Sequence, residues 1–284
     1  MNPIVEIQNL NKSFGKLKAL NQINLTINPG KIVGLIGPNG SGKTTMLRAL
    51  TGLIEYEGNI SILGHEPKLF RAELMKNVGV IHDIPVIPQW MKVWQALEFQ
   101  RQFNTKFNIE KCNEQLSKTN IKNNQKVGTL SKGMKTQLHL AMVLSTDTQF
   151  LVLDEPTHGL DILFRKQFYN SILEEYFNET RSIFISTHQI EEIEHILSDV
   201  IFIRKGEIIL LDSLENLNQK YSSISVNEKN ANDIRKLNPL SEQKILGSIN
   251  FLLKDIEKSK IDKYGQISKP SISDIFVAIM GGKE

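Results

Sequence analysis

A glycine-rich run that ends in a lysine and a threonine is the part of this sequence best suited to chemistry. Residues 37–44, Gly-Pro-Asn-Gly-Ser-Gly-Lys-Thr, fit the phosphate-loop pattern G-x-x-x-x-G-K-[ST] without a mismatch. Glycines let a backbone wrap closely around a ligand, and the N–H groups at a helix N-terminus attract phosphate. We therefore predict phosphate binding through Gly37, Asn39, Gly40, Ser41, Gly42, Lys43, Thr44 and Thr45.

The segments on either side must position this loop. The apolar run at residues 32–36 predicts a buried strand, and residues 45–50 predict the start of a helix. In that setting Lys43 reaches the β- and γ-phosphates of a nucleotide, and the Thr44 hydroxyl binds Mg²⁺. The alternative is a glycine-rich turn that matches by chance. The flanking strand and helix favour nucleotide binding over that alternative.

A second chemical signal is a pair of acids at the end of an apolar run. The segment Phe-Leu-Val-Leu-Asp-Glu at residues 150–155 is typical of a strand that ends in a carboxylate at the ligand-binding edge of a sheet. We expect Asp154 to hold Mg²⁺ and Glu155 to orient and polarise the attacking water. A solvated turn or a helix cap is the alternative. The phosphate loop upstream favours catalysis.

Composition sets limits on the class of protein. The 284 residues are 40% hydrophobic and 23% charged, with a net charge of +3, which fits one large α/β domain with a small addition and does not indicate a nucleic-acid partner. The single cysteine, Cys112, cannot form an internal disulfide and suits a reducing cytosol. The sequence shows neither a secretory signal nor an apolar run of about 20 residues that could cross a bilayer. We therefore expect a cytosolic chain.

Apolar patterning outlines the remaining elements of the first two thirds of the chain. Alternation at residues 4–10 and 23–27 predicts half-buried antiparallel strands. Residues 58–62 and 78–81 predict a further strand pair. The apolar spacing from 94 to 145 is that of helices. The continuous apolar runs at 150–153 and 183–185 are typical of a parallel sheet that is covered on both faces.

The last third is less clearly patterned. Residues 204–207 predict a hairpin turn that links strands at 200–203 and 208–211. After about Asp212, Asn, Ser and Lys become common, and short apolar runs remain at 245–246 and 249–253. We predict a small separate C-terminal domain there, with a flexible tail as the alternative.

Three further segments occur in a characteristic order with the two signals above: Leu-Ser-Lys-Gly-Met at 130–134, Gly-Leu-Asp at 159–161 and Ser-Thr-His at 186–188. Together they resemble the ATP-binding cassette family of transporter ATPases, over roughly residues 4–212. The resemblance implies an α/β fold with a P-loop NTPase core, a mixed sheet, an antiparallel β subdomain and an α-helical signature subdomain. We expect the nucleotide-binding domain at 1–214, its helical subdomain at about 84–145, and a small C-terminal α+β extension at 215–284.

The resemblance also implies roles for individual residues. Phe14 matches the aromatic residue that stacks on adenine, although a core phenylalanine is the alternative. Ser131 and Gly133 match the signature loop, which contacts the γ-phosphate of ATP on a partner subunit, and otherwise would form a helix cap. His188 matches the switch histidine that links the γ-phosphate to the catalytic water, with a structural hydrogen bond as the alternative. Asp161 matches the loop that communicates between two sites, or else caps a helix.

The sequence departs from the family pattern in two places. Lys132 and Met134 occupy signature positions where the family usually has a glycine and a glutamine. Asp83 occupies the position of a glutamine that contacts Mg²⁺ or water and senses the membrane subunit. A carboxylate can still bind Mg²⁺ through oxygen, but it adds negative charge near the γ-phosphate. Asp83 is therefore a hypothetical metal contact.

The resemblance predicts an ATP-dependent, Mg²⁺-dependent ATPase subunit that powers a separate transmembrane permease, with export favoured over import. It implies a dimer with a second nucleotide-binding subunit, no nucleic-acid partner, and peripheral association with the cytoplasmic face of the membrane. The permease would press on a groove near residues 84–103, which include Trp90 and Trp94, although each tryptophan could equally belong to the helical core. A soluble cassette ATPase of translation or DNA repair and a non-hydrolysing nucleotide-binding scaffold remain as alternatives.

Overall fold

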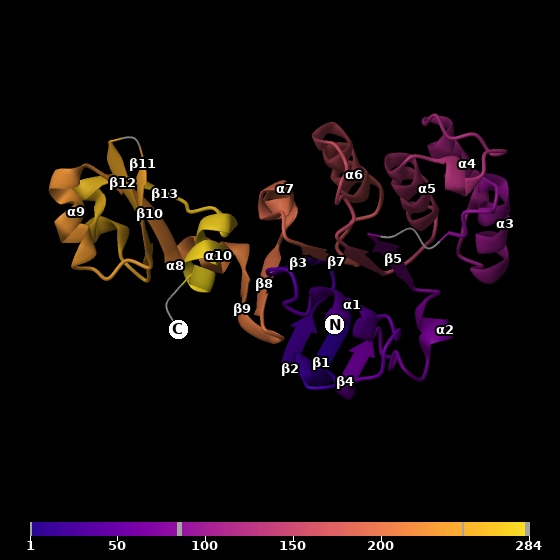
Figure 1. Cartoon of the computed structure of the whole chain (residues 1–284), viewed down its shortest axis with the longest axis horizontal. Helices are drawn as coiled ribbons and strands as arrows, with labels where there is room; N and C mark the ends of the chain where they lie inside the picture. The colour runs from indigo at the N-terminus through magenta and orange to yellow at the C-terminus, as the bar shows by residue number, and fades with distance from the viewer. Residues whose placement is uncertain (1, 84–86, 246, 282–284) are drawn as a thin grey trace. The chain divides into compact units, whose positions relative to one another are not determined.

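The parallel strands of the central sheet carry the residues predicted to do chemistry. A computed structural model describes residues 2–83, 87–245 and 247–281. Six strands lie in the order β5-β6-β7-β3-β8-β9 (Figure 1). They are β3 (Ile32–Ile36), β5 (Val78–His82), β6 (Phe150–Asp154), β7 (Ser182–Thr187), β8 (Asp199–Arg204) and β9 (Glu207–Ser213).

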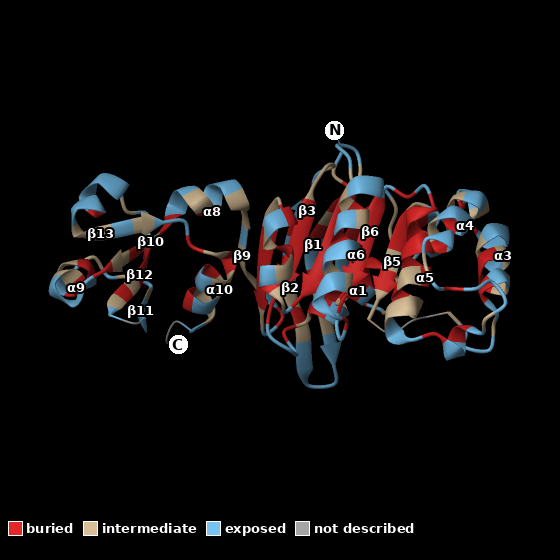
Figure 2. Ribbon diagram, turned by 90° about the horizontal axis from the view of Figure 1, so that it is seen from above, coloured by how far each residue is buried: buried red, intermediate tan, exposed pale blue. Residues whose placement is uncertain are grey.

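Burial on both faces explains the continuous apolar runs. Every residue of β3, β6 and β7 is buried, and β3 and β6 are labelled among the red strands in Figure 2. Strands β5, β6, β7 and β3 pair in parallel, so that their carboxyl ends meet at one edge. The predicted parallel sheet and the 204–207 hairpin are confirmed, since β8 and β9 are neighbours.

A second sheet is antiparallel, with the order β2-β1-β4. Its strands are β1 (Val5–Phe14), β2 (Leu17–Ile27) and β4 (Glu57–Ile62). The predicted pairing of residues 58–62 with 78–81 is wrong, because β4 pairs with β1 whereas β5 pairs with β6. The burial of the two strands explains the error: β4 is half exposed and suits a sheet with one wet face, while β5 is largely buried.

Helices connect the strands, and three of them fall within residues 84–145, where a helical subdomain was predicted. Helix α1 (Lys43–Leu50) follows β3, and α2 (Arg71–Leu74) precedes β5. Helices α3 (Val93–Phe103), α4 (Ile109–Ser117) and α5 (Lys132–Leu144) come between β5 and β6, and α6 (Ile162–Glu175) follows β6. A buried cluster joins α3, α4 and α5 and includes Val93, Cys112 and Leu138, so Cys112 is a core thiol. The predicted beginning of this subdomain, residues 84–86, lies outside the described residues.

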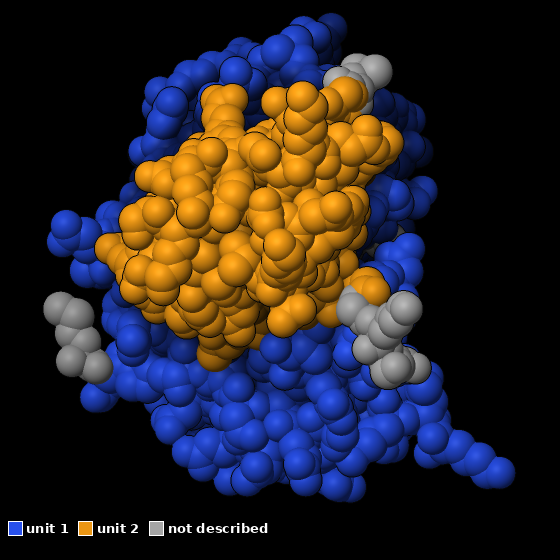
Figure 3. Space-filling model, turned by 90° about the vertical axis from the view of Figure 1, so that its left-hand side faces the viewer, with its two compact units in different colours: residues 1–188, 203–209 blue, residues 189–202, 210–284 orange. Residues whose placement is uncertain are grey.

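The chain divides into two compact units, coloured separately in Figure 3. The first comprises residues 1–188 and 203–209, and the second comprises 189–202 and 210–284. The second unit contains α7 (Ile190–Ile193), α8 (Leu214–Lys220), α9 (Glu228–Arg235) and α10 (Ile272–Gly281). It also contains an antiparallel sheet in the order β11-β12-β10-β13, from β10 (Tyr221–Val226), β11 (Ser241–Ile245), β12 (Ser248–Lys254) and β13 (Gly265–Ser268).

The second unit has its own apolar core, which includes Ile224, Ala231 and Phe251. A folded α+β extension therefore occupies the C-terminal region, rather than a flexible tail. The boundary at residue 214 stays a prediction.

Candidate nucleotide-binding site

The glycine-rich loop connects the end of β3 to the N-terminus of α1 and requires glycine at several positions. Gly40 and Gly42 have φ angles of 78° and 110°, in the left-handed region that favours glycine. A Cβ on Gly42 would lie 2.6 Å from the carbonyl oxygen of Ala19, and one on Gly37 would lie 2.5 Å from Ser41 Oγ. The sequence therefore folds here into a tight cradle that a larger residue would close.

The groups in this cradle fit a phosphate. Helix α1 has no side-chain cap, so the N–H groups at its N-terminus are free to bind an anion. Ser41 Oγ is buried and has no hydrogen-bond partner among the residues that the structure describes. Lys43 is buried, and its Nζ donates a hydrogen bond to Gly37 O at 2.8 Å. A buried hydroxyl without a hydrogen-bond partner is costly, and a bound phosphate would provide that partner.

The second half of the site lies where β6 and β7 end. Asp154 pairs with Ser186 across the two strands, and Ser186 Oγ donates a hydrogen bond to Asp154 Oδ1 at 2.6 Å. Thr44 Oγ1 lies 3.4 Å from the same carboxylate oxygen. A hydroxyl beside a carboxylate supplies the oxygen ligands that Mg²⁺ prefers. Thr44 and Asp154, both predicted metal ligands, are therefore brought together.

Glu155 is held from two sides. His188 Nδ1 lies 2.8 Å from its Oε2, and Lys43 Nζ lies 3.6 Å from its Oε1. The Glu155 backbone has a φ of 47°, uncommon for a residue with a side chain, and its N–H donates to Ser186 O at 3.1 Å. Strain of this kind is often found at functional sites. The structure thus brings together Lys43, Glu155 and His188, the three residues that the sequence analysis expects to take part in catalysis.

A hollow of about 710 Å³ joins these groups. Phe14, whose side chain is 49% exposed, lies on its lining, so the alternative of a core phenylalanine is wrong. Lys12 Nζ stands 5.0 Å from the centroid of the Phe14 ring. The lining also includes Asn39, Gly40, Gly42, Lys43, Thr44, Thr45, Asp83, Glu155, His158 and His188. The hollow therefore has an aromatic end at Phe14 and a charged end at the glycine-rich loop.

Comparisons with known proteins show which family this chain is similar to. A protein-family profile described as ABC transporter matches residues 20–158. The lantibiotic transport ATP-binding protein SrtF of Streptococcus pyogenes is 35% identical over 234 residues, covering 80% of this chain and 99% of SrtF. The chain belongs to the ABC transporter family.

Similarity to other members of the ABC transporter family extends further along the chain. The bacitracin transport ATP-binding protein BcrA of Bacillus licheniformis is 29% identical over 307 residues, and the alignment covers 99% of both chains, the C-terminal unit included. Among solved structures, a dimeric ATP-binding cassette in a post-hydrolysis state with ADP and Pi has a TM-score of 0.61 at 23% identity, covering 74% of this chain and 98% of that one. The predicted fold class is confirmed.

The signature residues of the ABC transporter pattern lie outside the hollow. Ser131 caps helix α5, where its Oγ accepts a hydrogen bond from Met134 N at 3.2 Å, and Gly133 lies in the first turn. Asp161 caps α6 by accepting from Phe164 N at 2.9 Å. Both residues therefore have the structural role that was the alternative. The structure does not bring them together with the phosphate loop of the same chain.

Two residues that sequence reasoning gave no role lie beside Asp83. Lys132 Nζ donates a hydrogen bond to Asp83 Oδ1 at 3.0 Å, and His158 Nδ1 lies 3.5 Å from the same oxygen. The only sequence signal for His158 is its position three residues after Glu155. The described residues contain no group of three His, Cys, Asp or Glu side chains arranged to hold a metal, so Asp83 does not join a ready-made metal cluster.

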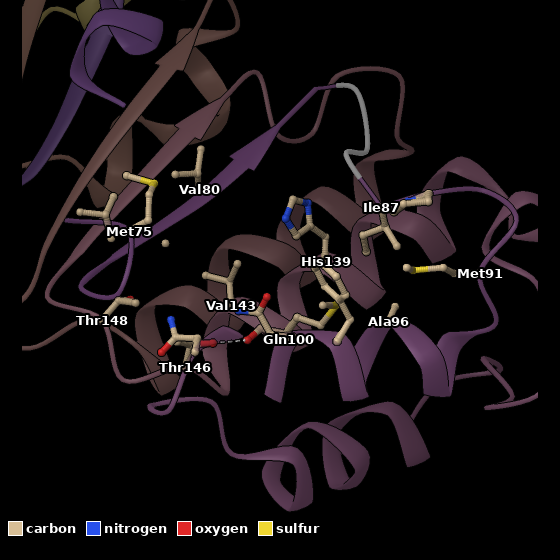
Figure 4. Close-up of a pocket in the computed structure, with 16 residues that line it drawn as sticks. Met75, Val80, Ile87, Met91, Ala96, Gln100, His139, Val143, Thr146 and Thr148 are labelled. Atoms are coloured by element: carbon tan, nitrogen blue, oxygen red, sulfur yellow. Dashed lines mark hydrogen bonds between the residues drawn. The ribbon is translucent and has the colours of Figure 1, made fainter. Parts of the chain in front are cut away.

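An apolar pocket of about 270 Å³ lies between β5 and helices α3 and α5 (Figure 4). Met75, Val80, Ala96 and Val143 contribute to its lining, together with the half-exposed Phe99. His139 also lines it, and burial lowers the pKa of this imidazole to about 4, with a smaller contribution from His82. A neutral histidine in an apolar wall can accept or donate one hydrogen bond to a visiting group.

Trp90 and Trp94 lie on the surface, just before and within helix α3, which borders this pocket. Trp90 is 69% exposed and Trp94 is 46% exposed, so neither belongs to the helical core.

None of the helices in the described parts of the chain combines the length and the apolar character needed to span a bilayer.

Proposed function

We propose that this protein is the ATP-binding and hydrolysing subunit of an export-type transporter, and that it powers a separate transmembrane permease. The observation that carries the proposal is the set formed by Lys43, Glu155 and His188 beside the phosphate loop, with Glu155 held at 2.8 Å from His188. Phosphoryl transfer needs charge neutralisation and an oriented water more than covalent chemistry, and these residue types supply both.

The residues divide the work of hydrolysis between them. Thr44 and Asp154 would hold Mg²⁺, which supplies positive charge against the phosphate oxygens when it is bound. Lys43 adds positive charge from the other side. Glu155 orients the attacking water and takes its proton at a carboxylate oxygen, while His188 fixes the direction of that carboxylate. Phe14 provides an aromatic face for adenine at the other end of the hollow.

Closure of a dimer around ATP would link this chemistry to transport. Ser131, Gly133 and Asp161 lie outside their own chain's hollow, which supports a role at the nucleotide of a second copy. The dimeric arrangement of the solved cassette with ADP and Pi also supports this proposal. ATP would favour the closed pair, and loss of the γ-phosphate would favour the open one, so that hydrolysis shifts a two-state equilibrium.

The permease would dock on the surface around the apolar pocket. Trp90, Trp94 and Phe99 are exposed there, and exposed aromatics are favoured in interfaces. The names of SrtF and BcrA, which refer to lantibiotic and bacitracin transport, support a role in the transport of compounds of this kind. Docking on a permease would place the chain at the cytoplasmic face of the membrane, as a peripheral subunit.

The test is whether a permease binds this chain and alters its ATP turnover. Tagged protein would be purified in mild detergent from native membranes, and ATP turnover compared before and after removal of the bound polytopic protein. We expect co-purification and a change in turnover. Phe99→Asp should weaken co-purification about tenfold or more, because it places a charge in an apolar contact. The matched control is Leu69→Asp, which changes a side chain that is 75% exposed and outside this pocket. An active ATPase that co-purifies with no membrane protein would favour a soluble ATPase instead.

Asp83 is proposed as a further contact to Mg²⁺ or its water. Its carboxylate lines the hollow together with Thr44 and Glu155. Asp83→Ala should therefore alter the Mg²⁺ concentration that gives half-maximal turnover. Turnover with unchanged Mg²⁺ dependence in this variant would exclude the metal role.

A further inference from the structure

The two departures from the family pattern contact each other in this protein. Lys132 stands at the start of α5, where the family usually has glycine, and Asp83 follows β5, where the family usually has glutamine. The Lys132 Nζ to Asp83 Oδ1 distance is 3.0 Å across 49 residues of sequence. Each replacement introduces a charge, and the two charges are opposite. The contact therefore pairs two changes that appear unrelated along the sequence.

The pair stands at the edge of the nucleotide hollow. Asp83 is part of the lining, and its Oδ1 also lies 3.5 Å from His158 Nδ1. The His158 ring meets the His188 ring edge-on, with centroids 5.7 Å apart and an angle of 76°. His188 in turn contacts Glu155. A line of contacts thus runs from the signature helix to the residue proposed as the catalytic base.

Folding stability does not explain such a pair. The side chains of Lys132 and Asp83 are 45% and 37% exposed, and ion pairs with that exposure contribute little to stability. Their location matters more, because a triphosphate with several negative charges would lie in the same hollow. A carboxylate without a countercharge would repel it, whereas the neutral amide of the family's glutamine would not.

We propose that Lys132 is a positioning residue that compensates the charge of Asp83. It neutralises the carboxylate toward the bound nucleotide and holds its Oδ1 beside His158. The two departures thus act as a matched pair, and the signature helix of one chain is tied to its own nucleotide site. This proposal rests on the proposed function, since it assumes that ATP binds in the hollow.

A double-mutant cycle separates compensation from a direct role of Lys132. The variants are Lys132→Gln, Asp83→Gln and the double variant, each measured for the kcat and KM of ATP turnover. Removing only the lysine leaves the carboxylate uncompensated, so K132Q should raise KM and lower kcat/KM about three- to tenfold at low salt. The double variant restores a neutral pair and should return to within about twofold of the D83Q value.

Two comparisons guard against a merely structural explanation. Lys135 lies on the same helix and forms no ion pair among the residues that the structure describes, so K135Q is the matched control and should change kcat/KM less than about twofold. The loss in K132Q should shrink when salt is raised to about 0.5 M, because screening weakens an exposed charge. Melting temperatures should be the same for all variants.

Two results would overturn the proposal. A loss in K132Q that persists in full in the double variant would mean that Lys132 acts on the nucleotide itself, not through Asp83. Equal values for K132Q and K135Q would mean that the pair has no role in the site.

A binding measurement distinguishes these results from failure of the proposed function. In a Glu155→Gln background, the affinity for fluorescent ATP is measured for the same variants without any turnover. K132Q should weaken binding about threefold, and the additional D83Q should restore it. If the starting protein binds ATP but hydrolyses none, the proposed function fails while this cycle still decides the role of Lys132.

Discussion

Two of the hollows in the first unit differ in character. The nucleotide hollow, of about 710 Å³, is lined by charged and polar groups that pair with each other, as Lys43 and His188 do with Glu155. The pocket of about 270 Å³ near α3 is lined mainly by apolar side chains and contains the buried His139. The first requires particular residue types at fixed positions, because it must match charge. The second requires only shape, so many sequences could form it.

The two hollows also differ in the surroundings of their histidines, His188 and His139. His188 is partly exposed beside a carboxylate at 2.8 Å, where it can exchange hydrogen bonds during a reaction. His139 has no hydrogen bond or ion pair with any described residue, and burial lowers its pKa to about 4. One histidine is thus placed for chemistry, and the other forms part of a neutral wall.

The largest expected effect comes from breaking the charge matching of the nucleotide hollow. Glu155→Gln keeps the shape and removes the base, so we expect turnover to fall about 10²- to 10⁴-fold while ATP binding is retained. The variant should also accumulate as an ATP-bound dimer, because hydrolysis no longer opens it. ATP turnover is measured as phosphate release, and dimerisation is measured by light scattering.

Glu179→Gln serves as the control for Glu155→Gln, because Glu179 is an exposed glutamate away from the hollow. It should behave like the unaltered protein in both assays. Unchanged turnover in E155Q would falsify the role of Glu155 as the base.

The second effect tests the neutral wall of the apolar pocket. The pKa of His139 is lowered from 6.5 to about 4 in the folded protein, so the unfolded chain binds a proton first as the pH falls. The contribution of neutral His139 to the free energy of unfolding is therefore fully present above about pH 6.5. It is lost as the pH falls toward 4, and the loss amounts to up to about 3 kcal/mol. Burial also lowers the pKa of His82, which adds in the same direction.

His139→Leu should flatten this pH dependence. The free energy of unfolding, measured by urea titration between pH 7 and 4, should fall less in the variant by up to about 3 kcal/mol. His195→Leu, at an exposed histidine, is the matched control and should keep the slope of the unaltered protein. Equal slopes in both variants would mean that water reaches His139 and that the wall is not apolar in solution.

The same contrast explains what could be predicted from sequence. Lys43 was identified from the glycine-rich loop that follows an apolar strand, and Asp154 and Glu155 from the end of another apolar strand. Parallel pairing then brings the ends of these strands to one edge of the sheet. The parallel sheet was predicted because burial on both faces leaves a continuous apolar run. In contrast, the pairing of 58–62 with 78–81 was wrong, since short apolar runs do not specify which strand is the partner.

The contacts of Lys132 and His158 with Asp83 could not be predicted, because they depend on how the start of α5 and the segment after β6 pack against the end of β5. The apolar pocket was missed for the same reason. Its lining comes from residues 75 to 148, and no local pattern marks a wall that forms only when these segments meet.

The smallest expected effect comes from a change at the aromatic end of the nucleotide hollow, which can be compared with its phosphate end. Phe14→Ala removes the stacking face for adenine, and the loss of about 0.5–1.5 kcal/mol should weaken ATP binding about two- to tenfold. Phe14→Tyr keeps the face and should bind ATP as the unaltered protein does. Inorganic triphosphate makes no use of the ring, so its affinity should be the same in all three proteins. Leu69→Ala, at an exposed side chain outside the hollow, controls for the loss of apolar surface. Phe14→Ala could instead weaken the binding of inorganic triphosphate and of ATP equally. In that case the ring would support the glycine-rich loop rather than stack on adenine, and the two ends of the hollow would not be independent.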